Sequence, residues 1–560
     1  MPQTAPSTSP VVELADRFWQ WFLSRQPFYA TILGDERYDD RLPDPSAAGR
    51  AEEVAALEGF LADTERIAPG GLTAEDAITL DMLSVVCRIQ LRGYEQHLYQ
   101  LEAVDQMAGP QSIPGELSRF QRVDSAERVD RLIKRLEAFP AYLAAQRENF
   151  EAGRAAGRTA AAPVVARVIE QTRRSVELPI GGEPLLAAHP EFDAATRARI
   201  TKAVEDHVRP ALADFLAALE AYEPAARAGD GLWALDDGDE IYRTLVLAST
   251  TLEADPQELH DYGLGQLEAI EQERRGIAAE LGFGDVAAMR RALAADPAGR
   301  ASRGEQIVEL ARAQIERAMA VAPRYFGRLP RAGCEVREVE PFQAKEAPPA
   351  FYFPPASDGS RGGVYYVNTY EPENRPLYRL AATTFHEAVP GHHFQIALEA
   401  ELDDLPDFRR YGARLVGIAY PEGWGLYSER LADEMGLYAT PWERLGMLDA
   451  QAWRAARLVV DTGIHAFRWE RERSVRLLES IGLTTLEAEA ETDRYIAWPA
   501  QALAYMTGQR EIAALRRELE QRDGASFDLA GFHDAVLGHG TLPLATLRRE
   551  LPGWVRPRGG

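Results

Sequence analysis

The sequence predicts a mainly helical protein with one small antiparallel sheet, and three observations support this fold class. Apolar residues recur at helical spacing through most of the 560-residue chain. Clusters of proline and glycine separate these stretches, as they do in turns between helices. Residues 333–370 differ, because aromatic and β-branched residues run or alternate there in the manner of short strands.

The first predicted helix covers residues 11–25, where Leu14, Phe18 and Phe22 fall on one face. Apolar stripes of this kind pack into a protein core rather than hold a cofactor. The same pattern predicts further helices near residues 47–67, 73–99, 125–157, 193–222, 255–281 and 302–321. We therefore regard residues 1–332 as an N-terminal helical region.

Three short segments make up the predicted sheet: Cys334–Val339, Ala350–Phe353 and Gly363–Thr369. An exposed strand edge can bind an extended peptide through main-chain hydrogen bonds. We expect such an edge at residues 364–368, which makes Tyr365, Tyr366 and Asn368 candidate substrate-binding residues. A structural hairpin without a binding role is the alternative interpretation.

The most specific pattern in the chain is residues 385–395, Phe-His-Glu-Ala-Val-Pro-Gly-His-His-Phe-Gln, which hold His386, His392 and His393 beside Glu387. A His-Glu pair begins the metal-binding helix of zinc peptidases. Its histidine binds the metal, and its glutamate accepts a proton from metal-bound water. The second histidine of a His-Glu-x-x-His helix would stand at position 390, where this chain has proline.

On a straight helix, His386 and His392 would lie about 9 Å apart along the axis and could not share one ion. Pro390 and Gly391 provide the remedy, because proline disfavours helical backbone before it and glycine permits unusual dihedral angles. A bulge that removes two residues would give the two histidines the relation of i and i+4. We therefore expect His392 as the second metal ligand, with His393 as the alternative.

A third ligand is expected on the helix predicted for residues 420–436, which begins near Pro421 and ends at Gly436. We assign Glu422 to the metal. Glu429 follows seven residues later on the same face, where a carboxylate suits the role of orienting a metal-bound histidine. An ordinary helix start is the alternative interpretation of this segment.

These motifs, taken together, resemble the domain of unknown function 885 family. The resemblance rests on residues 385–395, on Glu-Gly-Trp-Gly-Leu-Tyr-Ser-Glu at 422–429, on Pro-Ala-Gln-Ala-Leu-Ala-Tyr at 499–505, and on Phe-His-Asp-Ala-Val-Leu at 532–537. It covers most of the chain and is densest between residues 364 and 547. The chain departs from the family pattern at Ala500, where glycine is expected.

The resemblance implies a large helical fold with a deep cleft, similar to zinc oligopeptidases and angiotensin-converting-enzyme-like gluzincins. Residues 333–560 would then hold the sheet and the helical metal site, and would form one catalytic unit with residues 1–332. The family segment at 499–505 makes Tyr505 a candidate donor to the oxyanion formed when water attacks a carbonyl. Asp461 and His465, four residues apart, are candidates for an oriented donor pair.

Composition narrows the expected partners and location. The chain has 62 basic and 87 acidic side chains, and this net charge of −25 argues against a nucleic-acid partner. No apolar stretch is long enough to span a bilayer, which argues against a membrane partner. The first ten residues lack a basic region followed by an apolar run, so no secretory signal is recognised. We expect a cytoplasmic protein.

The sequence thus predicts a zinc-dependent hydrolase, a metallopeptidase that cleaves short peptides by Glu387-assisted attack of zinc-bound water. Zinc is expected on His386, His392 and Glu422. One alternative is a zinc hydrolase that acts on a non-peptide amide or ester. The other is a non-catalytic helical binding protein that keeps the fold with a vestigial site, and metal content would separate it from the enzymes.

Overall fold

The computed structural model describes residues 9–340, 344–345, 347–355 and 361–556. Most of the N-terminal segment that bears on secretion, residues 1–8, lies outside the described residues. The chain divides into two compact units, and each unit combines three segments of the sequence. The first unit contains Met1–Thr244, Ile464–Arg473 and Glu489–Pro499, and the second contains Leu245–Gly463, Ser474–Ala488 and Ala500–Gly560. The boundary expected at residues 332 and 333 falls inside the second unit.

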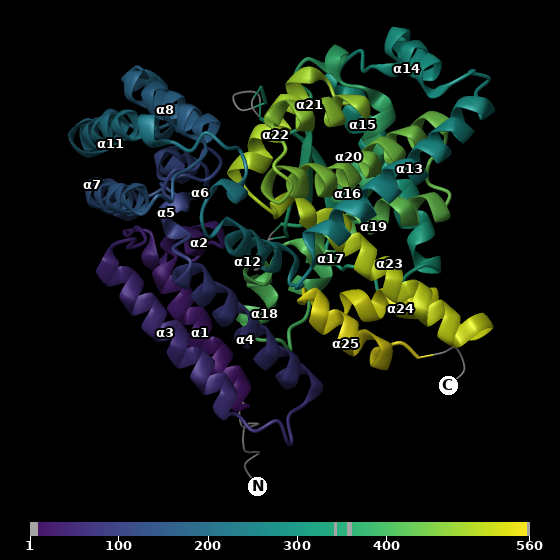
Figure 1. The fold of residues 1–560 in the computed structure, drawn as a ribbon, viewed down its shortest axis with the longest axis horizontal. Coiled ribbons are helices and arrows are strands. Elements are labelled where there is room, and N and C mark those ends of the chain that lie inside the picture. The colour runs from purple at the N-terminus through teal and green to yellow at the C-terminus, as the bar shows by residue number, and fades with distance from the viewer. Residues whose placement is uncertain (1–8, 341–343, 346, 356–360, 557–560) are drawn as a thin grey trace. The chain divides into compact units, whose positions relative to one another are not determined.

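The prediction of a mainly helical protein is confirmed. In the first unit the helices are α1 (Pro10–Arg25), α2 (Pro27–Ile32), α3 (Ala47–Arg66), α4 (Ala74–Glu95), α5 (Tyr99–Glu102), α6 (Ile113–Phe120), α7 (Ala126–Ala155), α8 (Ala162–Glu177), α9 (Pro184–Ala187), α10 (Ala194–Ala203) and α11 (Arg209–Tyr222). Helices α1, α3 and α4 pack side by side (Figure 1). The predicted stripe of α1 is buried at Leu14, Phe18 and Phe22.

The second unit is also built from helices. They are α13 (Pro256–Glu280), α14 (Val286–Ala295), α15 (Gly304–Val321), α16 (Leu380–Glu387), α17 (His392–Ala400), α18 (Asp407–Tyr411), α19 (Ala419–Glu434), α23 (Ala504–Asp523), α24 (Leu529–Leu537) and α25 (Leu544–Trp554). Four more helices contribute residues to both units: α12 (Gly238–Thr250), α20 (Pro441–His465), α21 (Arg471–Ser480) and α22 (Thr485–Ala497). Every helix of the described chain is too short or too polar to cross a membrane.

The sheet lies in the second unit and differs from the predicted one. Its strands are β1 (Cys334–Glu338), β2 (Ala350–Phe353) and β3 (Gly363–Val367), in the order β1-β3-β2. β3 pairs antiparallel with β2 and parallel with β1, so the sheet is mixed and the purely antiparallel prediction is wrong. The long connection between β1 and β3, which contains β2, allows the chain to return in the parallel direction.

Helices α19 and α23 approach each other closely because glycines face each other at their contact. A Cβ atom on Gly423 would lie 2.4 Å from the Cα atom of Gly508. A Cβ atom on Gly508 would overlap the carbonyl oxygen of Ala419. The two backbones can therefore touch only where both residues lack a side chain. This contact fixes the first turns of α19, from which Glu422 projects.

Candidate metal centre

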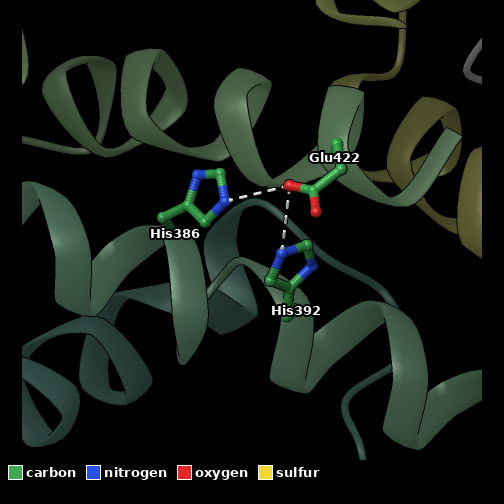
Figure 2. A group of neighbouring side chains, drawn as sticks. All are labelled: His386, His392 and Glu422. Carbon is green, nitrogen blue, oxygen red and sulfur yellow. Dashed lines mark ion pairs between the residues drawn. The ribbon is translucent and has the colours of Figure 1, made fainter. Parts of the chain in front are cut away.

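Three side chains from three helices converge in the second unit (Figure 2). His386 lies in the last turn of α16, His392 is the first residue of α17, and Glu422 lies in the first turn of α19. One ligand atom from each side chain lies within 4.8 Å of the others. Oε2 of Glu422 is 3.5 Å from Nε2 of His386 and 3.6 Å from Nε2 of His392. The structure thus brings together the three residues predicted to bind metal.

The two histidines reach this position because the helix breaks between them. α16 ends at Glu387, and α17 starts at His392 after a cis peptide bond between Val389 and Pro390. A Cβ atom on Gly391 would overlap the carbonyl oxygen of His386, so the reversal of the chain requires glycine. The interruption predicted at Pro390 and Gly391 is present, as a complete break between two helices. The imidazole rings stand nearly perpendicular, 4.8 Å apart.

Helix α19 holds this break from the other side. The indole Nε1 of Trp424 donates a 3.0 Å hydrogen bond to the carbonyl oxygen of Pro390. The Ser428 hydroxyl donates to the same oxygen at 3.3 Å. Gly425, which lies between Trp424 and Ser428, provides space for an imidazole: a Cβ atom there would lie 2.9 Å from Nε2 of His386. The Glu-Gly-Trp-Gly segment therefore combines a candidate ligand, two glycines that allow close contacts, and a tryptophan that holds the main chain at Pro390.

A buried chain of hydrogen bonds orients His386. Its Nδ1 lies 2.8 Å from Oε1 of Glu429, which directs Nε2 toward Glu422. Nε2 of Gln451 donates to the other oxygen of Glu429 at 3.0 Å, and Gln509 donates to Gln451 at 2.9 Å. Glu429 thus contacts His386, the histidine that it was expected to orient. By contrast, Nδ1 of His392 is buried and has no hydrogen-bond partner among the described residues.

The electrostatics of the three groups are strongly coupled. Burial alone would lower the pKa of His386, but the carboxylates of Glu422 and Glu429 raise it to about 9. Burial alone would raise the pKa of Glu422, but the two neighbouring imidazoles hold it well below its usual range. At neutral pH, the metal-free site therefore carries an ionised carboxylate against a protonated imidazole.

His393, the alternative ligand, lies outside the triad. Its Nδ1 is 2.9 Å from the hydroxyl of Tyr352 on β2. Burial lowers its pKa to about 4, so its ring is neutral at pH 7. The main-chain N–H of the same tyrosine donates a 3.1 Å hydrogen bond to Oε2 of Glu387. Tyr352 therefore connects the sheet to Glu387 and His393, the residues that directly follow the two histidines of the triad.

The three residues expected to bind substrate, Tyr365, Tyr366 and Asn368, each contact other parts of the protein. β3 is the central strand, so both of its edges are already paired and the expected free edge is absent there. Tyr365 is fully buried, and its hydroxyl lies 3.4 Å from that of Thr384. Tyr366 stacks on Phe351. The buried Asn368 donates to the carbonyl oxygens of residues 344 and 347.

Asp461 and His465 have separate partners. Asp461 accepts hydrogen bonds of 3.0 and 3.1 Å from the N–H of Ala500. That alanine has a φ of +68°, in the left-handed region that explains the glycine expected at this position. His465 accepts from the N–H of Leu232 and donates to the carbonyl oxygen of Tyr495. Its burial lowers its pKa to about 3. The structure gives both residues a role in packing.

Tyr505 lies in the first turn of α23, three residues before the Gly508 contact with α19. Its ring is half-buried, and two arginines of α20 lie against it. The guanidinium carbon of Arg457 is 4.4 Å from the ring centroid, and that of Arg454 is 5.9 Å from it. Both guanidinium groups therefore pack over the aromatic ring of Tyr505.

Comparisons with known proteins identify the family of this chain. The family described as "Bacterial protein of unknown function (DUF885)" matches residues 27–551. The chain belongs to this DUF885 family. No curated protein sequence gives a significant match to it.

Two solved structures share the fold of this DUF885 chain. The first is described as a putative lipoprotein from Colwellia psychrerythraea; it is 27% identical, has a TM-score of 0.90, and the match covers 98% of this chain and 99% of the other. The second is described as a putative lipoprotein of unknown function from Shewanella oneidensis. It is 19% identical with a TM-score of 0.77, and the match covers 97% of this chain and 100% of the other.

Sequence reasoning missed three contributors to this DUF885 site. Tyr352 lies on a separate strand, and nothing in its local pattern indicates a contact with Glu387. Gln451 and Gln509 lie on helices α20 and α23, whose apolar patterns predict packing alone. The glycines around Trp424 did offer a signal, because glycine inside a helical pattern marks a close approach.

The role of Gly425 can be tested by substitution. Gly425→Ala is expected to displace the His386 imidazole. Under the sequence-based expectation of a zinc site, it should weaken zinc binding by about 10–100-fold, the effect typical of a lost orienting partner. Isothermal titration with zinc would measure this change. Gly276→Ala is a matched control on a helix, because no atom lies within 4 Å of the added Cβ. Equal zinc affinity in Gly425→Ala and the native protein would contradict the proposed crowding.

Proposed function

We propose that this protein is a zinc-dependent hydrolase, and specifically a metallopeptidase that cleaves short peptides. The observation that carries the proposal is the convergence of His386, His392 and Glu422, with Glu387 adjacent to the first ligand. Two imidazoles and one carboxylate form the donor set of many catalytic zinc sites, which keep a fourth position for water or substrate.

The spacing of the donor atoms supports zinc. Ligand bonds of about 2.0–2.1 Å in tetrahedral geometry place ligand atoms about 3.3 Å apart. The carboxylate oxygen of Glu422 lies 3.5 and 3.6 Å from the two imidazole nitrogens, close to that spacing. The hydrogen bond from His386 to Glu429 is the carboxylate–histidine arrangement that orients zinc ligands. Glu422 is the most open of the three, with 22% of its side chain exposed, which favours access from its side.

Each residue then has a defined task. A bound zinc ion would act as a Lewis acid and lower the pKa of a water molecule at the site. Glu387 accepts a proton from the attacking water and returns it to the leaving amine. Glu429 keeps Nε2 of His386 aimed at the ion. The outer edge of β2, rather than β3, aligns an extended substrate, because it lies beside Glu387 and has no neighbouring strand among the described residues.

Metal analysis and substrate profiling test this proposal together. Purified protein is expected to contain one zinc ion per chain and to cleave members of a short-peptide pool, with activity abolished by a chelator and restored by zinc. Folded proteins are expected to resist cleavage. Turnover of a simple ester or acyl amide with no peptide cleavage would replace the peptidase proposal with a general zinc hydrolase. Absence of stoichiometric zinc would instead indicate a binding protein.

Tyr505 is proposed to stabilise the oxyanion. Tyr505→Phe is expected to lower kcat by about 100-fold and to change KM little, because the hydrogen bond strengthens as negative charge develops on the substrate oxygen. Steady-state kinetics on one cleaved peptide would measure both constants. A raised KM with unchanged kcat would show that Tyr505 contacts bound substrate without stabilising the transition state.

Zinc affinity is expected to depend on pH through His386. In the metal-free protein its pKa is raised to about 9, so below pH 9 the imidazole must lose a proton before it binds metal. Zinc affinity should therefore increase about tenfold per pH unit from pH 7 toward pH 9 and level off above it. Competition with a zinc indicator across this range provides the measurement, and a flat profile would contradict the assignment of His386.

The cytoplasmic location expected from the sequence stays a prediction. The two similar solved structures are both described as putative lipoproteins, so the alternative to a cytoplasmic location is attachment to a membrane. Cell fractionation followed by detection of the native protein separates the two.

A further inference from the structure

The N–H of Tyr352 is shared between two possible functions. It donates a 3.1 Å hydrogen bond to Oε2 of Glu387, the proposed proton acceptor. It also belongs to β2, the strand whose outer edge is proposed to align substrate. One N–H cannot direct its full hydrogen bond to both a carboxylate and a substrate carbonyl. Substrate alignment and the Glu387 contact therefore compete for the same donor.

The register of the sheet fixes the direction of this N–H. Tyr352 stands opposite Tyr365, and Phe351 stands opposite Tyr366. The N–H of Asn368 donates to the carbonyl oxygen of residue 349, so the hydrogen-bonded pairs of this ladder are those of residues 349, 351 and 353. Ala350 and Tyr352 form the alternate pairs, whose main-chain groups point away from β3. These groups are the ones that an added strand would use.

The side chain of Tyr352 keeps this amide in place. Its hydroxyl lies 2.9 Å from Nδ1 of His393, in the first turn of α17. The same hydroxyl lies over Gly363 of β3, where any Cβ atom would collide with it. β2 is thus attached to the neighbouring helices through two groups of Tyr352: the hydroxyl contacts His393 of α17, and the main-chain N–H contacts Glu387 of α16.

We propose that the Tyr352 N–H acts as a substrate-operated latch on Glu387, an inference that rests on the proposed hydrolase function. With the latch closed, the amide engages one oxygen of the Glu387 carboxylate. A peptide that pairs with the outer edge of β2 presents a carbonyl oxygen to this N–H and takes the hydrogen bond. Glu387 is then released to accept a proton from water beside the aligned scissile bond. Tyr352 is in this sense a positioning residue.

The latch makes chain length a determinant of turnover as well as of binding. A short acyl amide reaches the metal but leaves β2 unpaired, so Glu387 stays engaged and kcat is low. An extended peptide pairs with β2 and frees Glu387. The hydrogen bond to an ionised carboxylate is strong, so the expected difference in kcat between matched long and short substrates is about tenfold or more.

The test removes the N–H alone. Tyr352→Pro has no main-chain donor, and proline is tolerated on the outward side of an edge strand. Tyr352→Ala is the matched control, because it loses the same phenol and keeps the N–H. Two substrates are compared: a short acyl amide (the short reporter) and an extended peptide (the long reporter). Relative to Tyr352→Ala, Tyr352→Pro is expected to raise kcat for the short reporter and to raise KM for the long reporter. In Tyr352→Pro, the ratio of kcat for the long reporter to kcat for the short reporter should fall to about one. Persistence of the length dependence in Tyr352→Pro would overturn the latch.

Two further arms keep the test decisive if Tyr352→Pro folds poorly. With the native enzyme, each carbonyl of the extended peptide is replaced in turn by a methylene. Replacement of the one carbonyl that accepts from the Tyr352 N–H should lower kcat to the value for the short reporter. In metal-free protein, Glu387→Ala should accelerate hydrogen exchange of the Tyr352 amide, and a non-cleavable extended peptide should restore its protection. Unchanged exchange in Glu387→Ala also overturns the latch. Hydrolysis of both reporters by native enzyme without length dependence defeats the latch alone, whereas no zinc-dependent hydrolysis defeats the proposed function.

Discussion

Glu387→Gln is expected to abolish hydrolysis while the protein keeps its zinc. Glutamine has the same shape and can still accept the Tyr352 N–H, so the geometry of the site is preserved. It cannot accept a proton from water, and loss of a general base typically lowers rates by about 10²–10⁴-fold. Peptide-cleavage kinetics and metal analysis on the same preparation give the two readouts.

A matched control isolates the chemical role of this carboxylate. Glu373 is exposed and precedes α16 by several residues, so Glu373→Gln should leave both kcat and zinc content unchanged. Retention of more than about one tenth of kcat in Glu387→Gln would indicate another proton acceptor. Loss of zinc in that variant would instead mean that Glu387 contributes to metal binding.

Removal of a metal ligand is expected to have the other large effect. His386→Ala, His392→Ala and Glu422→Ala each leave two protein ligands, and each should weaken zinc binding by more than about 100-fold, the upper end of effects seen for outer partners. His393→Ala is a stringent control, because this neighbouring histidine contacts Tyr352 outside the triad. Equilibrium dialysis against a zinc buffer provides the affinities.

The ligand series also discriminates between the two candidate histidines. Zinc loss in His393→Ala with zinc retained in His392→Ala would show that His393, and not His392, is the second metal ligand. Full zinc occupancy in His386→Ala would defeat the whole assignment. Because His393 supports β2 through Tyr352, its substitution is expected to impair turnover of extended peptides more than zinc binding.

Local chemistry explains which features were predictable from the sequence. The helices follow from apolar periodicity, as in α1, where Leu14, Phe18 and Phe22 are buried. The juxtaposition of His386 and His392 follows from backbone restrictions at Pro390 and Gly391, which act within a few residues. The pairing of Glu429 with a histidine follows from helical spacing and the needs of a metal ligand. The first two inferences depend on neighbours in sequence. The third joins residues 43 apart and depends on the chemistry that a metal-bound histidine needs.

The missed features depend on contacts between distant segments. Aromatic and β-branched residues identify strands but do not specify their order, so the central position of β3 was not accessible. The partnership of Tyr352 with Glu387 spans 35 residues and involves a main-chain amide, which every residue except proline has. Likewise, Gln451 and Gln509 gain their role only because α20 and α23 meet beside Glu429.

The break between α16 and α17 affects how related centres can be found in other proteins. A pattern search for two histidines separated by one helical turn passes over this chain, since the ring nitrogens are delivered by the end of one helix and the start of the next. A three-dimensional template of two perpendicular imidazoles facing a carboxylate would retrieve it. Genome surveys based on linear motifs therefore undercount sites of this construction.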